Sequence, residues 1–441
     1  MLPILETQSQ KSFVEASYPH NSDIHNKLDD DMKSIVNSID ANTNRNALTN
    51  LNRKDLFQYF ANHISDFIDL ALNDTKSLYS KKAFLILSNG PPIVTDAITK
   101  DFTFFLKVTE LLQNPSNEID PCAISRIAII FQSIIFKSEQ FSIDSIGFLT
   151  QLLPYIEENA VFELFHTIFT TKKQLKNMQN LLSTINIDAF ILDELENSSV
   201  NTSYSGFFSY LKVYNLLKII SDGLKNKILQ KSFQNMRVLG ILSHLLKEVK
   251  ESLLLNEIWA SIALISDSNL VVKMKDIFAE AMKVISQQFD TLHPYHIYIF
   301  DFLSVVVDKN ASMFSAGQKK QICQIFQNLC LRFSNSTHLL SSMFNFIRKS
   351  LHTREFAQRV LDSYITFLIE LGRSEKRTAA AANALIFLAD LDQMKSSSYM
   401  ISKSLTSNRK YILFYNSFFK NYLDNLPKPY GGNVQRYSLA K

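Results

Sequence analysis

Apolar side chains recur at steps of three and four residues along most of this chain, which is the spacing of one face of an α-helix. Residues 119–170 show it best: Pro121 opens a nearly all-apolar stretch, and polar breaks separate this stretch from two further apolar ones. Because residues 121–136 are apolar on almost every side, we expect a central helix there. A buried strand is the competing interpretation, since isoleucine favours strands. The length, about 16 residues without internal glycine or further proline, favours the helix.

Short polar runs, rather than prolines, separate most of these stretches. Pro91, Pro92 and Pro115 mark early breaks, but no proline lies between Tyr155 and His293. Glycine and proline end helices, and runs of Ser, Asn, Asp and Thr do so more weakly. The expected helices cover residues 32–39, 44–73, 76–88, 93–99, 102–113, 121–136, 156–168, 204–231, 235–248, 250–265, 269–287, 293–308, 318–334, 336–351, 354–371, 376–393 and 408–424.

The later helices form pairs at a regular spacing. First helices are expected to start near residues 204, 250, 293, 336 and 375, a step of about 40 residues that is typical of HEAT and armadillo repeats. A bundle of antiparallel 18-residue helices would give a similar spacing. We predict an all-α fold, an α-α superhelix of HEAT/armadillo-like repeats (an α-solenoid), in which each pair packs on its neighbours and a long concave surface is left for protein partners.

The same pattern gives the expected domain organisation. Residues 1–27 are polar and without a sustained period, so we expect a flexible N-terminal arm. Residues 28–425 are expected to form a single helical-repeat domain. Residues 426–441, which contain two prolines and two glycines, are expected to form a basic, irregular C-terminal tail.

Composition narrows the function classes. Gly 9 and Pro 10 are low counts for 441 residues, which argues against turn-rich folds and glycine-dependent nucleotide loops. The net charge of +4 is small. Basic residues nevertheless gather from Lys395 to Lys441, where Asp424 is the sole acid against eight Lys or Arg. This segment is either a solubilising tail or a contact surface for an acidic partner or phosphate.

The cysteines and the apolar runs bear on location. Cys122, Cys323 and Cys330 form no spaced framework, which fits buried thiols in a reducing compartment. We therefore expect the protein in the cytoplasm, and also in the nucleus. The N-terminus has no apolar core adequate for a signal peptide. The best apolar run, residues 127–136, is too short to span a bilayer, so no membrane insertion is expected.

We find no sequence motif for catalysis, cofactor binding or metal binding. P-loop, dinucleotide-binding, H-E-x-x-H and G-x-S-x-G patterns are all missing from the sequence. His293 and His296 are expected to cap or pack a helix start rather than bind a metal, and His166 to be a satisfied core or edge histidine rather than a base. The adjacent acids Glu157 and Glu158 are interpreted as residues of a helix's first turn, where negative charge is favourable.

Two small basic clusters remain, one at Lys172, Lys173 and Lys176 and one at Arg373, Lys376 and Arg377. Solvated helix ends explain both, and nucleic-acid binding, which calls for a denser basic face, is not expected. A run of small side chains at Ala379–Ala382, with Ala384, predicts a close approach between helices.

Several segments resemble the SAPS domain, the helical-repeat part of regulatory subunits of protein phosphatase 6-type Ser/Thr phosphatases. They are the acidic helix start Leu28–Asp31, the helix that begins at Asn44–Leu48, Leu111–Asn114 leading to Ile119–Pro121, the helix entry Ile156–Leu164, and the late helix pair Ile365–Leu388 with its basic connection.

The resemblance implies a non-catalytic regulatory or scaffold subunit that binds a Ser/Thr phosphatase catalytic subunit and directs its activity or substrates. The positions to test first for partner binding are Lys172, Lys173, Arg373, Lys376 and Arg377. A generic HEAT/armadillo-like adaptor in transport, trafficking or the cytoskeleton remains an alternative. A helical enzyme is a third, and it would require a deep pocket of converging polar side chains.

Overall fold

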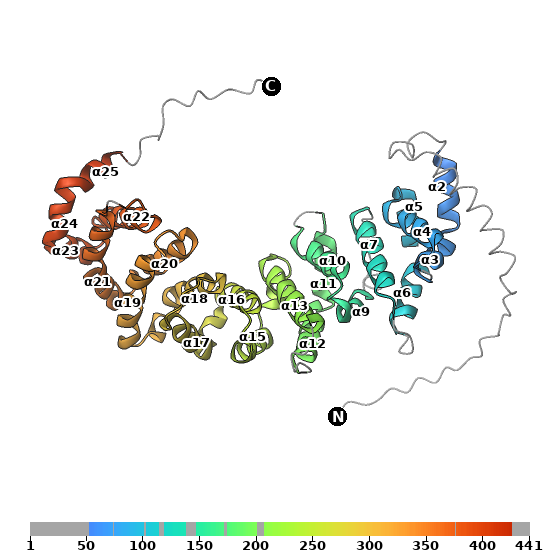
Figure 1. Ribbon diagram of the computed structural model, residues 1–441, viewed down its shortest axis with the longest axis horizontal. Coiled ribbons are helices and arrows are strands. Elements are labelled where there is room, and N and C mark those ends of the chain that lie inside the picture. The colour runs from blue at the N-terminus through green and yellow to red at the C-terminus, as the bar shows by residue number, and fades with distance from the viewer. Residues whose placement is uncertain are drawn as a thin grey trace, which may run out of the picture. The chain divides into compact units, whose positions relative to one another are not determined.

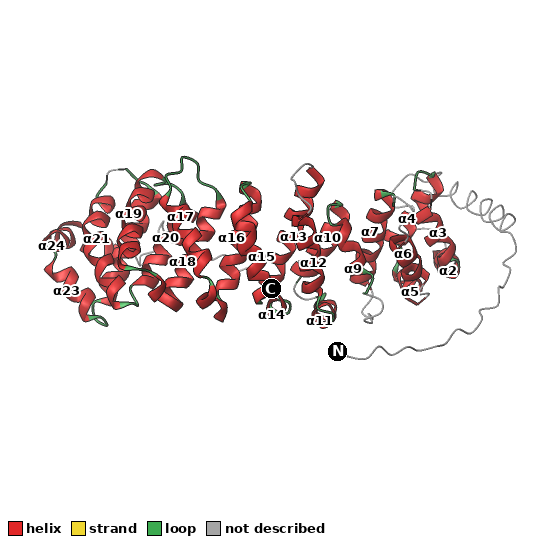
Figure 2. Ribbon diagram, turned by 90° about the horizontal axis from the view of Figure 1, so that it is seen from below, coloured by secondary structure: helices red, strands yellow, loops and turns green. Residues whose placement is uncertain are grey.

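The computed structural model describes residues 53–73, 75–100, 103–113, 119–137, 147–171, 174–200, 207–374 and 376–425. The expected N-terminal arm, the expected helix at 32–39, the C-terminal tail, and Lys172 and Lys173 lie outside these residues. The described part of the chain consists of helices and loops without a strand (Figure 2). It falls into two compact units, Met1–Gln140 and Phe141–Lys441. The single domain expected over residues 28–425 stays a prediction.

The first unit is built around a buried helix, α7. Its described helices are α2 (Arg53–Asn62), α3 (Ile64–Asn73), α4 (Leu78–Asn89), α5 (Pro92–Lys100), α6 (Thr103–Gln113) and α7 (Pro121–Lys137). Helix α7 packs on α3, α4 and α5, as its apolar sequence predicts, and the alternative of a strand is wrong. Its apolar surface is not buried on every side, because Ile129 and Phe136 are exposed.

One charged side chain lies inside this unit. Arg126 of α7 is only 5% exposed, and its guanidinium donates hydrogen bonds to the carbonyl of Ala71 (2.6 Å), the hydroxyl of Ser80 (2.6 Å) and the carbonyl of Thr75 (2.8 Å). These groups lie where α3 ends and α4 begins. The C-terminal carbonyls of a helix lack partners within the helix, so Arg126 satisfies them from the neighbouring α7 and fixes the α3–α4 turn.

The second unit carries the repeats. Its described elements are α9 (Leu149–Leu152), η2 (Leu153–Tyr155), α10 (Asn159–Thr170), α11 (Lys176–Thr184), α12 (Ile187–Val200), α13 (Phe207–Lys225), α14 (Gln230–Phe233), α15 (Met236–Glu248), α16 (Ser252–Ser266), η3 (Asn269–Lys273), α17 (Lys275–Ser286), α18 (Pro294–Asn310), η4 (Ala311–Met313), α19 (Ala316–Arg332), α20 (Thr337–Ser350), α21 (Arg354–Gly372), α22 (Ala379–Met394), α23 (Tyr399–Ser407), α24 (Arg409–Phe414), the π-helical turn η5 (Tyr415–Phe419) and α25 (Lys420–Asn425).

These helices stack in two layers. Helices α13, α16, α18, α20 and α22, here called the B layer, pack each on the next (Figure 1). Helices α12, α15, α17, α19 and α21, here called the A layer, lie on the other side of the stack. Successive B-layer helices start 42 to 45 residues apart, close to the starts expected from the sequence. The predicted all-α solenoid is confirmed.

Some expected helices are interrupted, for identifiable reasons. The helix expected over 204–231 ends at Lys225, because the Asn226 side chain accepts from the N–H groups of Ile228 and Leu229 and begins a new turn. The helix expected over 408–424 contains the π-helical turn η5. Helix α23 was not expected at all; Ser398 starts it by accepting from the N–H of Ile401, in a segment whose apolar residues are few.

Small side chains let α22 approach its neighbours closely. Ala380 and Ala384 are fully buried, and the N–H of Ala380 donates to the carbonyl of Ser334 at 2.8 Å. Gly372 at the end of α21 lies against Leu385, since a Cβ there would meet its side chain at 2.8 Å. The close approach predicted from the alanine run is confirmed.

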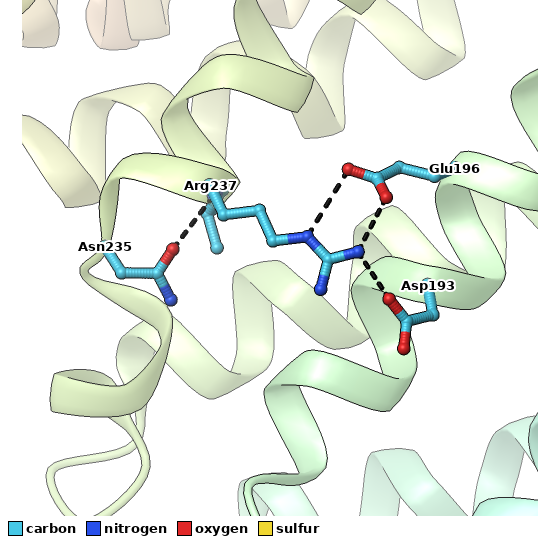
Figure 3. A network of polar contacts seen from close by, with 5 residues as sticks. Asp193, Glu196, Asn235 and Arg237 are labelled. Carbon is cyan, nitrogen blue, oxygen red and sulfur yellow. Dashed lines mark hydrogen bonds and ion pairs between the residues drawn. The ribbon is translucent and has the colours of Figure 1, made fainter. Parts of the chain in front are cut away.

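An ion-pair network joins two A-layer helices (Figure 3). The Arg237 guanidinium of α15 donates to the Asp193 and Glu196 carboxylates of α12, at 2.6 Å for the shorter Glu196 contact. These two acids raise the pKa of Arg237, chiefly through their hydrogen bonds. All three side chains are substantially exposed, so the network sets helix register and contributes little stability.

Candidate interaction surfaces

The positions singled out for partner binding lie at one described place. Arg373, Lys376 and Arg377 form the connection from α21 to α22 and are all exposed. The Arg373 guanidinium lies 5.9 Å from the centre of the Phe414 ring, while Lys376 and Arg377 make no ion pair within the described residues. The interpretation as solvated helix ends holds for Lys376 and Arg377, and Arg373 also covers an aromatic ring.

The two basic clusters do not form a common surface in their described parts. Lys176 is exposed at the start of α11, which packs on α10 and α12. Helices α13, α16, α18 and α20 are stacked between α10 and α22. An extended partner would therefore be needed to contact Lys176 and Arg373 together.

The B layer carries a series of polar contacts that sequence analysis did not find. Each contact joins one B-layer helix to the next. They are Lys218 with Glu257 at 3.7 Å, the Asn256 amide oxygen accepting from the N–H of Tyr295 at 2.8 Å, Asp308 with Lys349 at 3.7 Å, and Arg348 with Asp390 at 2.7 Å. The partners are about one repeat apart in sequence, so pairs of polar residues at that separation could have shown the contacts.

These contacts leave the B layer polar and ordered. Partly exposed pairs of this kind contribute at most about 1 kcal/mol each, and their main effect is to fix the register of adjacent helices. Asn256 does more, because its amide satisfies one of the unpaired N–H groups at the start of α18. As a result, the B layer presents a regular surface of side chains that are already held in place. Such a surface loses less conformational freedom on binding and is therefore pre-organised.

A hollow of about 330 Å³ opens between α18 and α20 of this layer. It is lined by Pro294, Ile297, Tyr298, Asp301, His338, Ser341 and Ser342. Burial raises the pKa of Asp301, and a hydrogen bond from Ser342 and the charge of Lys349 partly offset that rise. The hollow thus presents one half-buried carboxylate beside an aromatic ring and hydroxyl groups.

A second hollow, of about 460 Å³, lies beside α10 and α13 and includes Asp222 in its lining. Asp222 is buried, and one of its oxygens lies 2.7 Å from Nδ1 of His166, whose ring also stacks on Phe162. Within the described residues no serine or cysteine lies within hydrogen-bond distance of the His166 ring. The prediction of a satisfied edge histidine is confirmed.

The other polar groups of this second hollow hold the end of α10. Gln179 donates to the carbonyls of Ile168 and Thr171, and Asn226 donates to the carbonyl of Phe169. They satisfy helix carbonyls that would otherwise lack partners. The converging polar set required by an enzyme is therefore not formed by these side chains.

His293 and His296 start α18. The N–H of His293 donates to Nδ1 of His296 at 3.0 Å, and the His296 ring stacks on Phe289 with 3.9 Å between ring centres. Burial lowers the pKa of His296 to about 4, although the hydrogen bond with the backbone of His293 opposes this shift. The predicted capping and packing role is confirmed. Among the described residues no group of three His, Cys, Asp or Glu side chains could hold a metal ion.

The acids Glu157 and Glu158 lie just before α10, not in its first turn. Glu158 is the N-cap residue and Glu157 precedes it. Burial raises the pKa of Glu157, with the charge of Lys212 opposing the rise. The expected first-turn position is wrong, by one residue for Glu158 and by two for Glu157, because the backbone of Glu158 is still extended and α10 begins at Asn159.

The cysteines differ from one another. Cys323 and Cys330 are buried, and burial raises the pKa of both thiols, whereas Cys122 at the start of α7 is exposed. All three are free thiols. The expectation of buried thiols is right for two and wrong for Cys122, which lies on the open side of the first turn of α7.

The end of the repeat stack is both basic and apolar. Lys403, Arg409 and Lys420 are exposed there and make no ion pair within the described residues. Tyr399 is exposed on the same helix as Lys403, α23, and Leu413 is exposed on the same helix as Arg409, α24. Both interpretations of the basic segment, solubilising tail and contact surface, fit the residues that are described.

Helices long and apolar enough to cross a bilayer do not occur in the described segments of the chain.

The two layers, the regular repeat and the pairing of helices define the class: an all-helical solenoid of HEAT/armadillo-like repeats. Comparison with models of known protein families and with curated proteins finds no match. Among solved structures, the chain is similar to the armadillo-like helical protein SYS-1, solved in a crystal complex of SYS-1 and POP-1. The identity is 12%, the TM-score is 0.54, and the match covers 85% of this chain and 73% of that one.

A second solved structure, described as an engineered protein, matches with a TM-score of 0.39 and 14% identity over 80% of this chain and 99% of that chain. That score is too low to bear on the fold. At 12% identity the SYS-1 likeness shows the fold alone.

Proposed function

We propose that this chain is a non-catalytic scaffold protein that binds other proteins along its B layer. The observation that carries the proposal is the continuous row of fixed polar contacts on this layer, with a hollow between α18 and α20. Solenoids use such repeated surfaces for extended protein partners. The likeness to SYS-1, solved in complex with POP-1, supports a binding role.

Such a scaffold acts by proximity. Two proteins held on one solenoid meet at a high effective concentration, which raises the rate of their reaction without any chemistry from the scaffold itself. The side chains of the His166 region, which serve helix ends and packing, fit this role.

We further propose that one partner is a Ser/Thr phosphatase catalytic subunit of the protein phosphatase 6 type. The support is the resemblance of Ile156–Leu164 and Ile365–Leu388 to the SAPS domain, together with the exposed basic connection at Arg373, Lys376 and Arg377. A reducing compartment, the cytoplasm or nucleus, is proposed with it, since all three cysteines are free thiols.

The test is affinity capture of the tagged full chain from native lysate, with quantitative mass spectrometry. We expect enrichment of a Ser/Thr phosphatase catalytic subunit, and loss of that enrichment when Arg373, Lys376 and Arg377 are changed together to Glu. The matched control changes Lys247, Lys273 and Lys275 to Glu, the same number of exposed cations elsewhere in the second unit. Enrichment of other proteins without a phosphatase would favour the adaptor alternative.

A further inference from the structure

The hollow between α18 and α20 has an unusual combination of shape and charge. Its volume of about 330 Å³ is at the lower end of the range of about 300–1,000 Å³ for small-molecule sites. It therefore suits one large side chain of a partner better than a cofactor. Its walls come from two helices whose spacing is fixed by the neighbouring Asp308–Lys349 contact.

Asp301 gives this hollow its chemistry. The carboxylate is half-buried and accepts a hydrogen bond from Ser342, but no cation of the described residues lies within ion-pair distance of it. An ionised carboxylate can accept about four hydrogen bonds, so most of its capacity is free. Burial of this carboxylate is costly, and the more distant charge of Lys349 offsets only part of the effect. A ligand that brings a positive charge into the hollow would remove more of the cost.

The other lining residues select among cations. Besides Asp301, the lining consists of the aromatic ring of Tyr298, the imidazole of His338, the hydroxyl groups of Ser341 and Ser342, and the apolar side chains of Ile297 and Pro294. A guanidinium group is planar, has five N–H donors, stacks on aromatic rings and sits on an apolar stem. Arginine therefore matches the carboxylate, the aromatic ring, the hydroxyl groups and the apolar surface with one planar head group, whereas the compact ammonium of a lysine has no flat face to stack on a ring and no fork of donors to pair with a carboxylate.

An anionic ligand fits less well. No lysine or arginine lines the hollow, and Asp301 would repel a phosphate or carboxylate. The hollow lies near the first turns of α18 and α20, but the effect of a helix dipole fades within the first turn, and Asp301 lies two turns into α18.

We propose that the α18–α20 hollow is a binding site for an arginine side chain of a protein partner, with Asp301 as the ion-pairing residue and Tyr298 as the stacking surface. This proposal rests on the proposed scaffold function, for which it names the chemistry of one anchor. It places that anchor on the B layer, apart from the basic connection at Arg373.

The site can be tested without knowing the partner. The full chain is labelled with ¹³C at isoleucine δ1 methyl groups, and the Ile297 signal is assigned with Ile297→Val. N-acetyl-arginine amide is the probe, and N-acetyl-citrulline amide, which has the same shape but no charge, is its control. We expect a saturable shift of the Ile297 signal with the arginine probe and none with citrulline.

Two variants complete the experiment. Asp301→Asn keeps the shape of the side chain and is expected to weaken the arginine probe at least about tenfold, because charge-assisted bonds are the strong ones. Asp276→Asn, which changes an exposed carboxylate of α17 outside the lining, is expected to change the affinity less than about twofold. Equal shifts with citrulline, or unchanged affinity in Asp301→Asn, would overturn the proposal.

The outcome is separable from that of the capture experiment. Captured partners with no response of Ile297 to arginine would reject the arginine site and leave the scaffold function standing. A saturable response of Ile297 to arginine, in a chain that captures no partner, would support the arginine site and reject the scaffold function.

Discussion

At the scale of single residues, the informative positions are polar groups in apolar surroundings. The sequence shows Arg126 only as the flank of an apolar run and His296 only as half of a histidine pair. In the structure both are buried, and each satisfies backbone groups at a helix end. Which backbone group a side chain meets depends on the packing of distant segments, 55 residues apart for Arg126 and Ala71, so periodicity could not predict it.

The first prediction concerns Arg126. Arg126→Met keeps an unbranched apolar stem but removes the donor to the Thr75 carbonyl and the shorter of two hydrogen bonds to the Ala71 carbonyl, which retains the Ser80 hydroxyl at 3.3 Å. Each buried unsatisfied acceptor costs about 1–3 kcal/mol, so we expect a loss of at least about 2 kcal/mol in the first unit. Hydrogen exchange of the amides in α3 and α4 should then be roughly thirtyfold faster. Lys100→Met, an exposed change in the same unit, should leave that exchange unchanged; equal exchange in both variants would contradict the role given to Arg126.

The second prediction concerns pH. Because the pKa of His296 in the fold, about 4, lies below its ordinary value of about 6.5, the unfolded chain binds the extra proton between these values. The contribution of neutral His296 to the free energy of unfolding is therefore complete above about pH 6.5. As the pH falls toward 4, the free energy of unfolding decreases by about 2–3 kcal/mol.

Urea titrations followed by Trp259 fluorescence measure this loss, since Trp259 is the sole tryptophan and is buried in α16 against α18. His296→Gln keeps an acceptor for the N–H of His293, as in a capping box. In this variant the free energy of unfolding should decrease much less between pH 6.5 and 4. His338→Gln, an exposed change, should show the full decrease. If His296→Gln lost as much free energy of unfolding between pH 6.5 and 4 as the unmodified chain does, a group other than His296 would be responsible for the pH dependence.

At the scale of elements, the repeat period is the feature that sequence predicts best. The starts of α13, α16, α18, α20 and α22 follow the expected first helices closely, because each helix buries one apolar face and the pattern records that face. The apolar pattern does not predict where a helix is interrupted by a side chain that accepts from backbone N–H groups, as Asn226 does after α13. It also does not predict the π-helical turn η5, because apolar residues continue through that turn.

The third prediction uses two helical glycines of the second unit. A Cβ on Gly223 of α13 would meet the buried ring of Phe233 at 2.6 Å, whereas a Cβ on Gly240 of α15 would meet nothing within 4 Å. Gly223→Ala should therefore destabilise the unit by about 1–3 kcal/mol through overpacking. Gly240→Ala should stabilise it by about 0.5–1 kcal/mol, the ordinary gain of alanine over glycine in a helix.

Urea unfolding, followed by the fluorescence of Trp259, measures the change in stability of each variant. A stabilised Gly223→Ala variant would mean that α14 moves freely away from α13. A destabilised Gly240→Ala variant would mean that the outer side of α15 is covered.

At the scale of the whole molecule, the sequence predicts the fold class and leaves the binding surface open. The helical period and the step of about 40 residues suffice for the solenoid, which the structure confirms. The sequence singles out the basic clusters as candidate binding positions, because charged residues can be identified without knowing the fold. The hollow at Asp301 was not found, because Tyr298 and Ser342 come together only when α18 and α20 pack.

The measurement that tests the central claim most directly compares the two layers. Ile386→Arg changes an exposed apolar residue of α22 in the B layer, and Leu331→Arg makes the same change on α19 in the A layer. Both variants are captured from native lysate beside the unmodified chain, after urea unfolding has shown that each is folded. If proteins bind along the B layer, Ile386→Arg loses the main captured partner at least about tenfold, which corresponds to about 1.4 kcal/mol, and Leu331→Arg keeps it. Retention of that partner by Ile386→Arg, with loss by Leu331→Arg, would contradict the account.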